Sequence, residues 1–170
     1  MDVFYLVFRL IHIISGIVWV GGALLIFFYI EPAATKLGPA AETFVTEVFT
    51  NRKLPIYFAL ASTLTVIAGA ILYLRGAGGL ALWRGTTGTV LTLGALSAIV
   101  AWVGGNALIP RSFLQLQALG AEAKAAGGPP SADLQGRIHA VQERLRMIGV
   151  IDTVLLVIAV IAMESAKYLG

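Results

Sequence analysis

The sequence predicts an all-α fold, a four-transmembrane-helix bundle in which the third and fourth helices extend into an extramembrane helical hairpin. Four apolar stretches are each long enough for a helix to cross a hydrocarbon core of about 30 Å. Hydrophobic residues make up 58% of the 170 residues, and charged residues only 12%. Two amphipathic stretches flank a Gly-Gly-Pro-Pro turn between the last two apolar stretches. We therefore expect a single integral membrane domain over residues 1–170.

The composition excludes several other classes of protein. A soluble domain carries about 25% charged residues, so this chain has too little charge to cover a surface in water, and the lipid bilayer is its expected partner. The chain has no cysteine, which excludes disulfides, thiolate metal sites and cysteine nucleophiles. The net charge is +3, but the basic residues flank the apolar stretches. The positive-inside bias of membrane proteins explains this pattern, and no nucleic-acid partner is expected.

The first span is expected at residues 3–30, where only Arg9 and His12 interrupt the apolar run. It should end at Glu31 and Pro32, because proline lacks the backbone N–H that continues a helix.

The second span, at residues 54–74, carries no charge and has Pro55 in its first turn, where a missing N–H costs little. The third span, at residues 85–109, is also uncharged and stops before Pro110. The fourth span is expected at residues 147–166. Each is close to the roughly 20 residues that a membrane helix needs.

The connection between the first two spans predicts a short helix at residues 41–50, lying in the membrane interface. Apolar and acidic residues alternate there with the spacing of an amphipathic helix. The apolar side holds Phe44, Val45, Val48 and Phe49, and the acidic side holds Glu42 and Glu47.

The connection between the last two spans predicts an antiparallel helical hairpin. The third helix should continue to residue 126, and a helix at 131–146 should lead into the fourth span, with Ser131 as its N-cap. Each arm would extend about 24 Å, at about 1.5 Å per residue. The two arms carry matching apolar stripes, namely Phe113, Leu116, Gly120 and Ala123 on one and Leu134, Ile138, Val141 and Leu145 on the other.

Small residues recur at four-residue spacing on the second and third spans. Such rows let membrane helices approach each other closely, which favours a compact bundle. The rows are Ala61, Thr65 and Gly69, and Ser97, Ala101 and Gly105.

Four spans place both termini on one side of the membrane. Basic residues number four on the terminal side and eight on the side of the long connections. The positive-inside rule then places both termini outside an inner cell membrane and the long connections in the cytoplasm. The four are Arg9, Arg75, Arg84 and Lys167; the eight are Lys36, Arg52, Lys53, Arg111, Lys124, Arg137, Arg144 and Arg146.

One face of the first helix carries most of its polar chemistry. Arg9, His12, Gly16 and Trp19 follow one another at steps of three and four residues, so they share that face. Ionisable groups at membrane depth usually face the bundle interior or an aqueous cavity. These four residues are therefore candidates for binding a cofactor. The alternative is that His12 only bonds a neighbouring helix while Arg9 reaches the headgroups.

Two carboxylates on the fourth helix are further candidates for buried polar groups. Glu164 lies near the same end as Arg9 and could pair either with Arg9 or with Lys167. Asp152 lies towards the other end, at a depth similar to that of Asn106. Asn106 could form a hydrogen bond with Asp152 there, or the long side chain of Arg146 could reach it.

Haem b is the cofactor that these residues suggest, with His12 as the metal ligand. The other histidine, His139, lies in the hairpin on the opposite side of the membrane, so one chain cannot bring both imidazoles to one iron. Met163 lies near the same end as His12, and thioether sulfur is a known axial ligand of haem iron. Copper transport would need clusters of Met, Cys or His, and the sequence has none.

The first helix, from Arg9 to Gly22, resembles the opening of two membrane families. These are the copper-resistance protein D-like proteins and the HemJ-type protoporphyrinogen oxidases. The shared pattern is a histidine, six residues, a tryptophan, one residue and then small residues. The resemblance covers about 20 residues and implies that His12 is a haem ligand, with Trp19 and Gly21 as its framework. HemJ-type proteins continue with a Pro-Arg-rich segment ending in histidine, which residues 28–32 lack.

Three classes of function stay open at this point. The first is a haem b-binding protein with a redox or tetrapyrrole-related role. The second is a permease for a small solute or a metal such as copper. The third is an accessory or structural subunit that joins a homo-oligomer or a larger membrane complex, with the hairpin as its docking arm.

Overall fold

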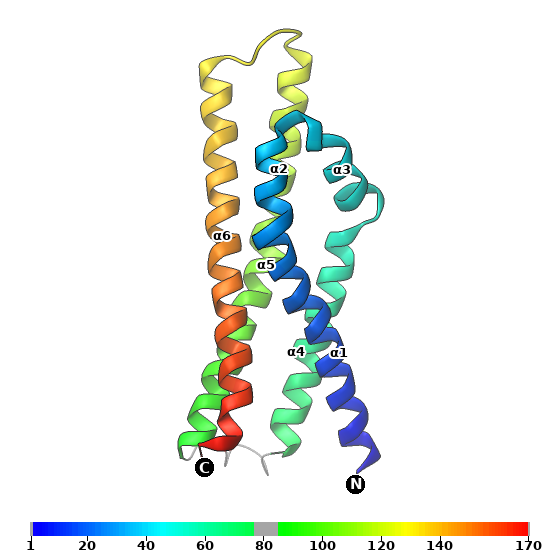
Figure 1. Ribbon diagram of the computed structural model, residues 1–170, viewed down its shortest axis with the longest axis vertical. Helices are drawn as coiled ribbons and strands as arrows, with labels where there is room; N and C mark the ends of the chain where they lie inside the picture. The colour runs from blue at the N-terminus through cyan, green and yellow to red at the C-terminus, as the bar shows by residue number, and fades with distance from the viewer. Residues whose placement is uncertain (1, 77–84, 170) are drawn as a thin grey trace.

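The computed structural model describes residues 2–76 and 85–169 and is helical throughout its regular elements (Figure 1). Arg84, one of the basic residues in the topology prediction, lies outside the described residues. The elements are α1 (Val3–Leu25), a π-helical segment (Ile26–Ile30), α2 (Glu31–Leu37), a 3₁₀ segment (Gly38–Ala41), α3 (Glu42–Thr46), a second π-helical segment (Glu47–Asn51), α4 (Leu54–Gly76), α5 (Thr86–Ala125), α6 (Ala132–Ser165) and a C-terminal 3₁₀ segment (Ala166–Tyr168).

Four helical stretches are long and apolar enough to cross a membrane, which confirms the predicted all-α fold at this level. They run over Val3–Leu37, Leu54–Arg75, Thr86–Ala125 and Ala132–Tyr168. Large apolar side chains point outwards along all four, as expected for helices that face lipid rather than water. This fold is compatible with an integral membrane protein.

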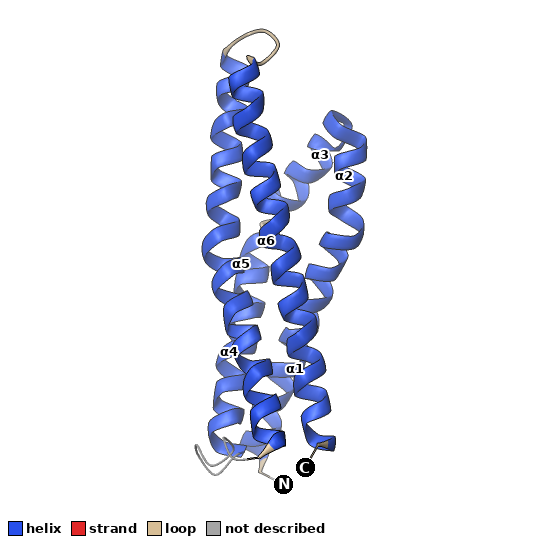
Figure 2. Ribbon diagram, turned by 90° about the vertical axis from the view of Figure 1, so that its left-hand side faces the viewer, coloured by secondary structure: helices blue, strands red, loops and turns tan. Residues whose placement is uncertain are grey.

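The four helices form two pairs that stand side by side. α1 packs along α4, and α5 packs along α6. Both termini lie at the same end of the molecule (Figure 1). At the other end, α2 and α3 lean away from the α5–α6 pair, which rises beyond them to its turn (Figure 2).

One buried layer ties the two pairs together with a residue from each long helix. Trp19 of α1, Ala61 of α4, Ala101 of α5 and Leu156 of α6 pack against one another and are all nearly inaccessible to solvent. Ala61 and Ala101 belong to the two rows of small residues, which explains why the helices approach so closely at this level.

The first helix continues past Pro32, where it was predicted to end. The chain widens into a π-helical turn over Ile26–Ile30, and the N–H of Glu31 bonds the carbonyl of Ile26. Pro32 then occupies the first turn of α2. A proline ring clashes with the carbonyl four residues earlier in a regular helix, and the wider π turn relieves that clash. The helical path therefore runs on to Leu37.

The segment predicted as one helix at residues 41–50 is helical in three short pieces, over Gly38–Asn51. This segment packs against α5: the ring of Phe49 stacks on that of Phe113, with 5.6 Å between centroids. Lys124 also donates a hydrogen bond to Glu42, at 3.1 Å.

α5 and α6 form one antiparallel pair along their whole length. α5 passes through Pro110 without ending. Ser131 caps α6 as predicted, because its hydroxyl accepts a hydrogen bond from the N–H of Leu134. Near the turn, both guanidinium nitrogens of Arg137 donate to the carboxylate of Glu122, at 2.9 and 3.0 Å. Such a two-pronged ion pair fixes the register of the two arms.

Candidate functional site: a cavity beside His12

A cavity of about 520 Å³ lies between the two helix pairs, towards the terminal end of the molecule. Ligand sites commonly have volumes of about 300–1,000 Å³ and apolar walls with a few polar groups. The walls come from α1, α4, α5 and α6, and most of their residues are aliphatic. The side chains with polar or sulfur atoms are Tyr5, His12, Thr65, Tyr73, Thr92 and Met163.

His12 is held on the α4 side of this cavity by a hydrogen bond to the backbone. Its Nδ1 lies 2.8 Å from the carbonyl oxygen of Thr65. A carbonyl oxygen can only accept, so Nδ1 carries the proton and donates it. In the neutral ring the proton on Nδ1 leaves a lone pair on Nε2. A backbone carbonyl that fixes the tautomer in this way is typical of histidines that bind metals.

Gly69 makes this hydrogen bond sterically feasible. A Cβ at this position would lie 2.8 Å from Cε1 of His12 and 3.0 Å from Nδ1, but 3.9 Å from Nε2. The edge of the imidazole that carries Cε1 and Nδ1 therefore faces α4 at Gly69, and Nε2 is the ring nitrogen farther from Gly69. The absence of a side chain at Gly69 leaves the space that the imidazole of His12 occupies.

We expect Gly69→Ala to displace the imidazole, because a carbon cannot stay within 3 Å of the ring. The His12–Thr65 hydrogen bond should be lost, and the free energy of unfolding should fall by about 1–3 kcal/mol. Nitrogen-15 NMR of labelled histidine would report the loss of the fixed Nδ1–H tautomer. Gly21→Ala is the matched control on α1, where an added methyl group meets no atom within 4 Å. If both variants keep the same histidine signals and stability, the proposed role of Gly69 is wrong.

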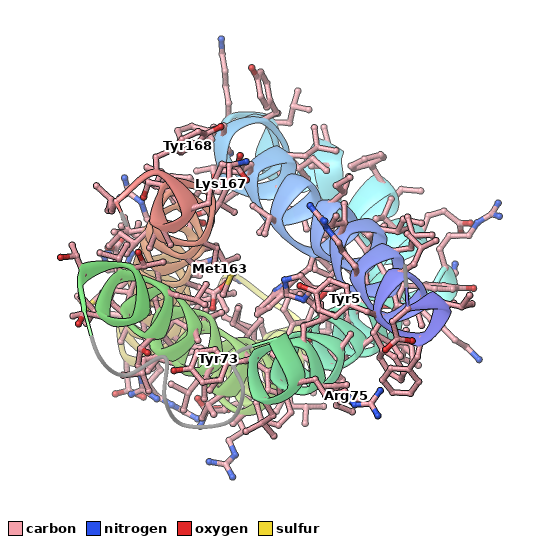
Figure 3. All side chains as sticks on the ribbon, turned by 90° about the horizontal axis from the view of Figure 1, so that it is seen from below. Tyr5, Tyr73, Arg75, Met163, Lys167 and Tyr168 are labelled. Atoms are coloured by element: carbon pink, nitrogen blue, oxygen red, sulfur yellow. The ribbon has the colours of Figure 1, made fainter. Side chains whose placement is uncertain are left out.

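The other walls of the cavity are supplied by α5 and α6. α6 comes close to α5 at Gly94, where a Cβ would lie 3.2 Å from Cγ of Met163. The hydroxyl oxygens of Tyr73 and Thr92 lie 2.7 Å apart and join α4 to α5. Figure 3 shows Tyr5 and Met163 directed into the space between the helices, whereas Arg75 points outwards. The cavity thus has an imidazole and a thioether in its lining.

Only two of the predicted cofactor-binding residues, His12 and Met163, line the cavity. Arg9 is exposed on the outside of α1. Trp19 is only 4% exposed and belongs to the buried layer described above. Gly16 makes room for α4, since a Cβ there would touch Thr65 at 3.6 Å. The structure therefore places Arg9, Gly16 and Trp19 away from the cavity.

The prediction of a buried Glu164 is wrong, because its side chain is 69% exposed and pairs with Lys167. The two residues lie three positions apart in the last turn of the chain's final helix, so they meet without any other helix. Among the described ion pairs, none joins Arg9 to Glu164.

Asp152 is buried as predicted, but Asn106 bonds other groups. The Asn106 amide donates to the hydroxyl of Ser62 at 3.2 Å and to the carbonyl of Trp102 at 2.9 Å. The indole of Trp102 donates in turn to Thr63, at 3.1 Å. These bonds join α5 to α4, and no hydrogen bond between Asn106 and Asp152 is among the described contacts.

Tyr5, Tyr73, Thr92 and the role of Gly69 were not predicted from the sequence. One signal for them was present: Thr65, Gly69 and Tyr73 follow each other at four-residue steps on α4. Residues four apart share a face of a helix. Thr65 and Gly69 were interpreted as small packing residues only.

The fold and the site together define an all-helical protein, with four apolar helices around a cavity that His12 lines. The chain matches no protein-family model, no curated protein and no solved structure.

Proposed function

We propose that this chain is an inner-membrane protein that crosses the bilayer four times, with both termini outside. Four apolar helices and two termini at one end support this arrangement. The excess of basic residues in the long connections supports a cytoplasmic position for them. The ends of α5 and α6 then form a helical hairpin in the cytoplasm, because 40 residues are about twice the length that a span needs.

We further propose that the cavity binds haem b, with Nε2 of His12 as an axial ligand. The observation that carries this proposal is the hydrogen bond from Nδ1 to the Thr65 carbonyl, which leaves Nε2 free to coordinate. The cavity volume and its mostly apolar walls suit a large, flat, apolar ligand. The resemblance of residues 9–22 to two membrane families also supports a ligand role for His12.

Met163 is the candidate for the second axial position. It lines the same cavity and has a thioether that can bind iron. When bound, haem would supply reversible one-electron transfer. Among the chain's own residues, Thr65 would fix the tautomer of His12, the aliphatic walls would keep water out, and His12 and Met163 would bind the iron.

A metal permease has less support. In residues 2–76 and 85–169, no three His, Cys, Asp or Glu side chains come together to hold an ion. His12 is accompanied in the cavity by tyrosine and threonine hydroxyls and one thioether, which do not form a copper pathway.

The absorption spectrum of the detergent-purified protein tests the haem proposal directly. We expect a Soret band and one iron per chain, with a shift of the band on reduction that marks a cytochrome. Supplying haem precursors during expression controls for incomplete loading. A colourless, iron-free protein that does not take up added haem would contradict the proposal.

A further inference from the structure

Asp152 is a buried carboxylate in the middle of the α5–α6 pair, away from the cavity beside His12. The residue is only 8% exposed. Its Oδ1 lies against two consecutive glycines of α5, since a Cβ on either Gly104 or Gly105 would be 3.8 Å from it. The two glycines leave room for the carboxyl group against the backbone of α5.

No donor meets this carboxyl oxygen in the part of the chain that the structure describes. Oδ1 is fully covered and has no hydrogen-bond partner. The nearby amide of Asn106 is already used by Ser62 and by the carbonyl of Trp102. An ionised carboxylate would therefore have neither water nor a donor at this atom.

No charged group of the surrounding helices pairs with Asp152 among the described contacts. α5 has no titratable side chain before Arg111. None of the groups on the packed elements forms a described ion pair or hydrogen bond with Asp152. Those groups are Tyr5, Arg9 and His12 on α1, Tyr29 on the π-helical segment after it, Glu31 and Lys36 on α2, Tyr57, Tyr73 and Arg75 on α4, Arg111, Glu122 and Lys124 on α5, Asp133, Arg137, His139, Glu143, Arg144, Arg146 and Glu164 on α6 itself, and Lys167 and Tyr168 at the C-terminal end.

We propose that Asp152 is a proton-binding site, at which the contact between α5 and α6 accommodates the neutral carboxylic acid better than the carboxylate. A charged carboxylate in an apolar bundle without a partner is costly, whereas the neutral acid is not. The acid also gains an O–H, which can donate to a helix carbonyl. Loss of the proton places a bare charge between α5 and α6 and weakens their contact at Gly104 and Gly105.

Infrared spectroscopy of the full-length protein in lipid tests directly whether Asp152 carries a proton. We expect the C=O stretch of a protonated carboxyl group that weakens as the pH is raised, is shifted in D₂O and is absent in Asp152→Asn. Glu164→Gln is the matched control on the same helix and should keep the band, because Glu164 is exposed and pairs with Lys167. A wild-type spectrum without the band, or a band that survives in Asp152→Asn, overturns the proposal.

The pH dependence of stability provides a second, independent measurement. The melting temperature of the wild-type protein should fall as the pH rises and the proton leaves Asp152, and that of Asp152→Asn should fall by several degrees less. Glu164→Gln should follow the wild type. The proposal is overturned if the melting temperatures of the wild type and Asp152→Asn change equally with pH. It is also overturned if added sodium raises the melting temperature of the wild type but not of Asp152→Asn, because Asp152 would then bind a cation. Neither measurement depends on haem, so the two proposals can fail separately.

Discussion

Replacing His12 by alanine should remove haem from the purified protein and leave the four-helix fold in place. Among the described residues that line the cavity, His12 supplies the one nitrogen ligand, since the remaining lining side chains are apolar or carry hydroxyl or thioether groups. Without the imidazole, the thioether of Met163 is the candidate ligand that remains among these residues, and a single weak ligand does not retain haem through purification. We expect at least a tenfold loss of Soret absorbance per chain.

The matched control for this prediction is His139→Ala. His139 is exposed on the hairpin arm of α6, so its removal should leave the spectrum unchanged. Circular dichroism and the elution volume of His12→Ala would show whether the bundle is intact. Added imidazole should restore part of the absorbance, because the truncated side chain leaves space beside Gly69. A His12→Ala protein with the full wild-type spectrum would contradict the assignment of His12 as the ligand.

The length and polarity of the apolar stretches were sufficient to predict the four helices. Those features decide whether a segment can lie in lipid, whatever its neighbours are. The prolines were less informative. Pro110 lies inside α5, and the third helix was expected to continue past it. Pro32, where the first helix was expected to end, follows a π-helical turn, and this local change in helix type accommodates the proline. The end of a membrane helix cannot be inferred from proline alone.

The site was predicted only in part, because sharing a helical face does not mean sharing a depth. Trp19 lies on the same face as His12 but seven residues further on, about 10 Å along the axis at about 1.5 Å per residue. It therefore reaches the buried layer and not the cavity. His12 and Met163 both lie in the terminal halves of their helices, and the structure places both in the lining of the cavity. The direction of each α4 side chain depends on which helices flank α4, and the sequence does not specify these.

Leu156→Ala should be the most destabilising single truncation in the bundle. Leu156 is 1% exposed and lies in the layer that holds one residue from each long helix. Two of its three partners, Ala61 and Ala101, have no side chain that could rotate into the space left behind. The void should therefore persist. Substitutions of this kind cost about 2–5 kcal/mol, with the larger values where the surroundings cannot collapse.

Ile161→Ala on the same helix separates this packing effect from a general loss of apolar surface. Ile161 is 61% exposed, so in the membrane it would face lipid and its truncation should cost within about 0.5 kcal/mol. Unfolding by a denaturing detergent in mixed micelles gives both free energies under one set of conditions. If the layer of Trp19, Ala61, Ala101 and Leu156 joins the two helix pairs, the two variants must differ by several-fold in this cost. Equal costs would mean that the pairs are held together elsewhere, with the contacts of Tyr73 and Thr92 at the cavity as the next candidates.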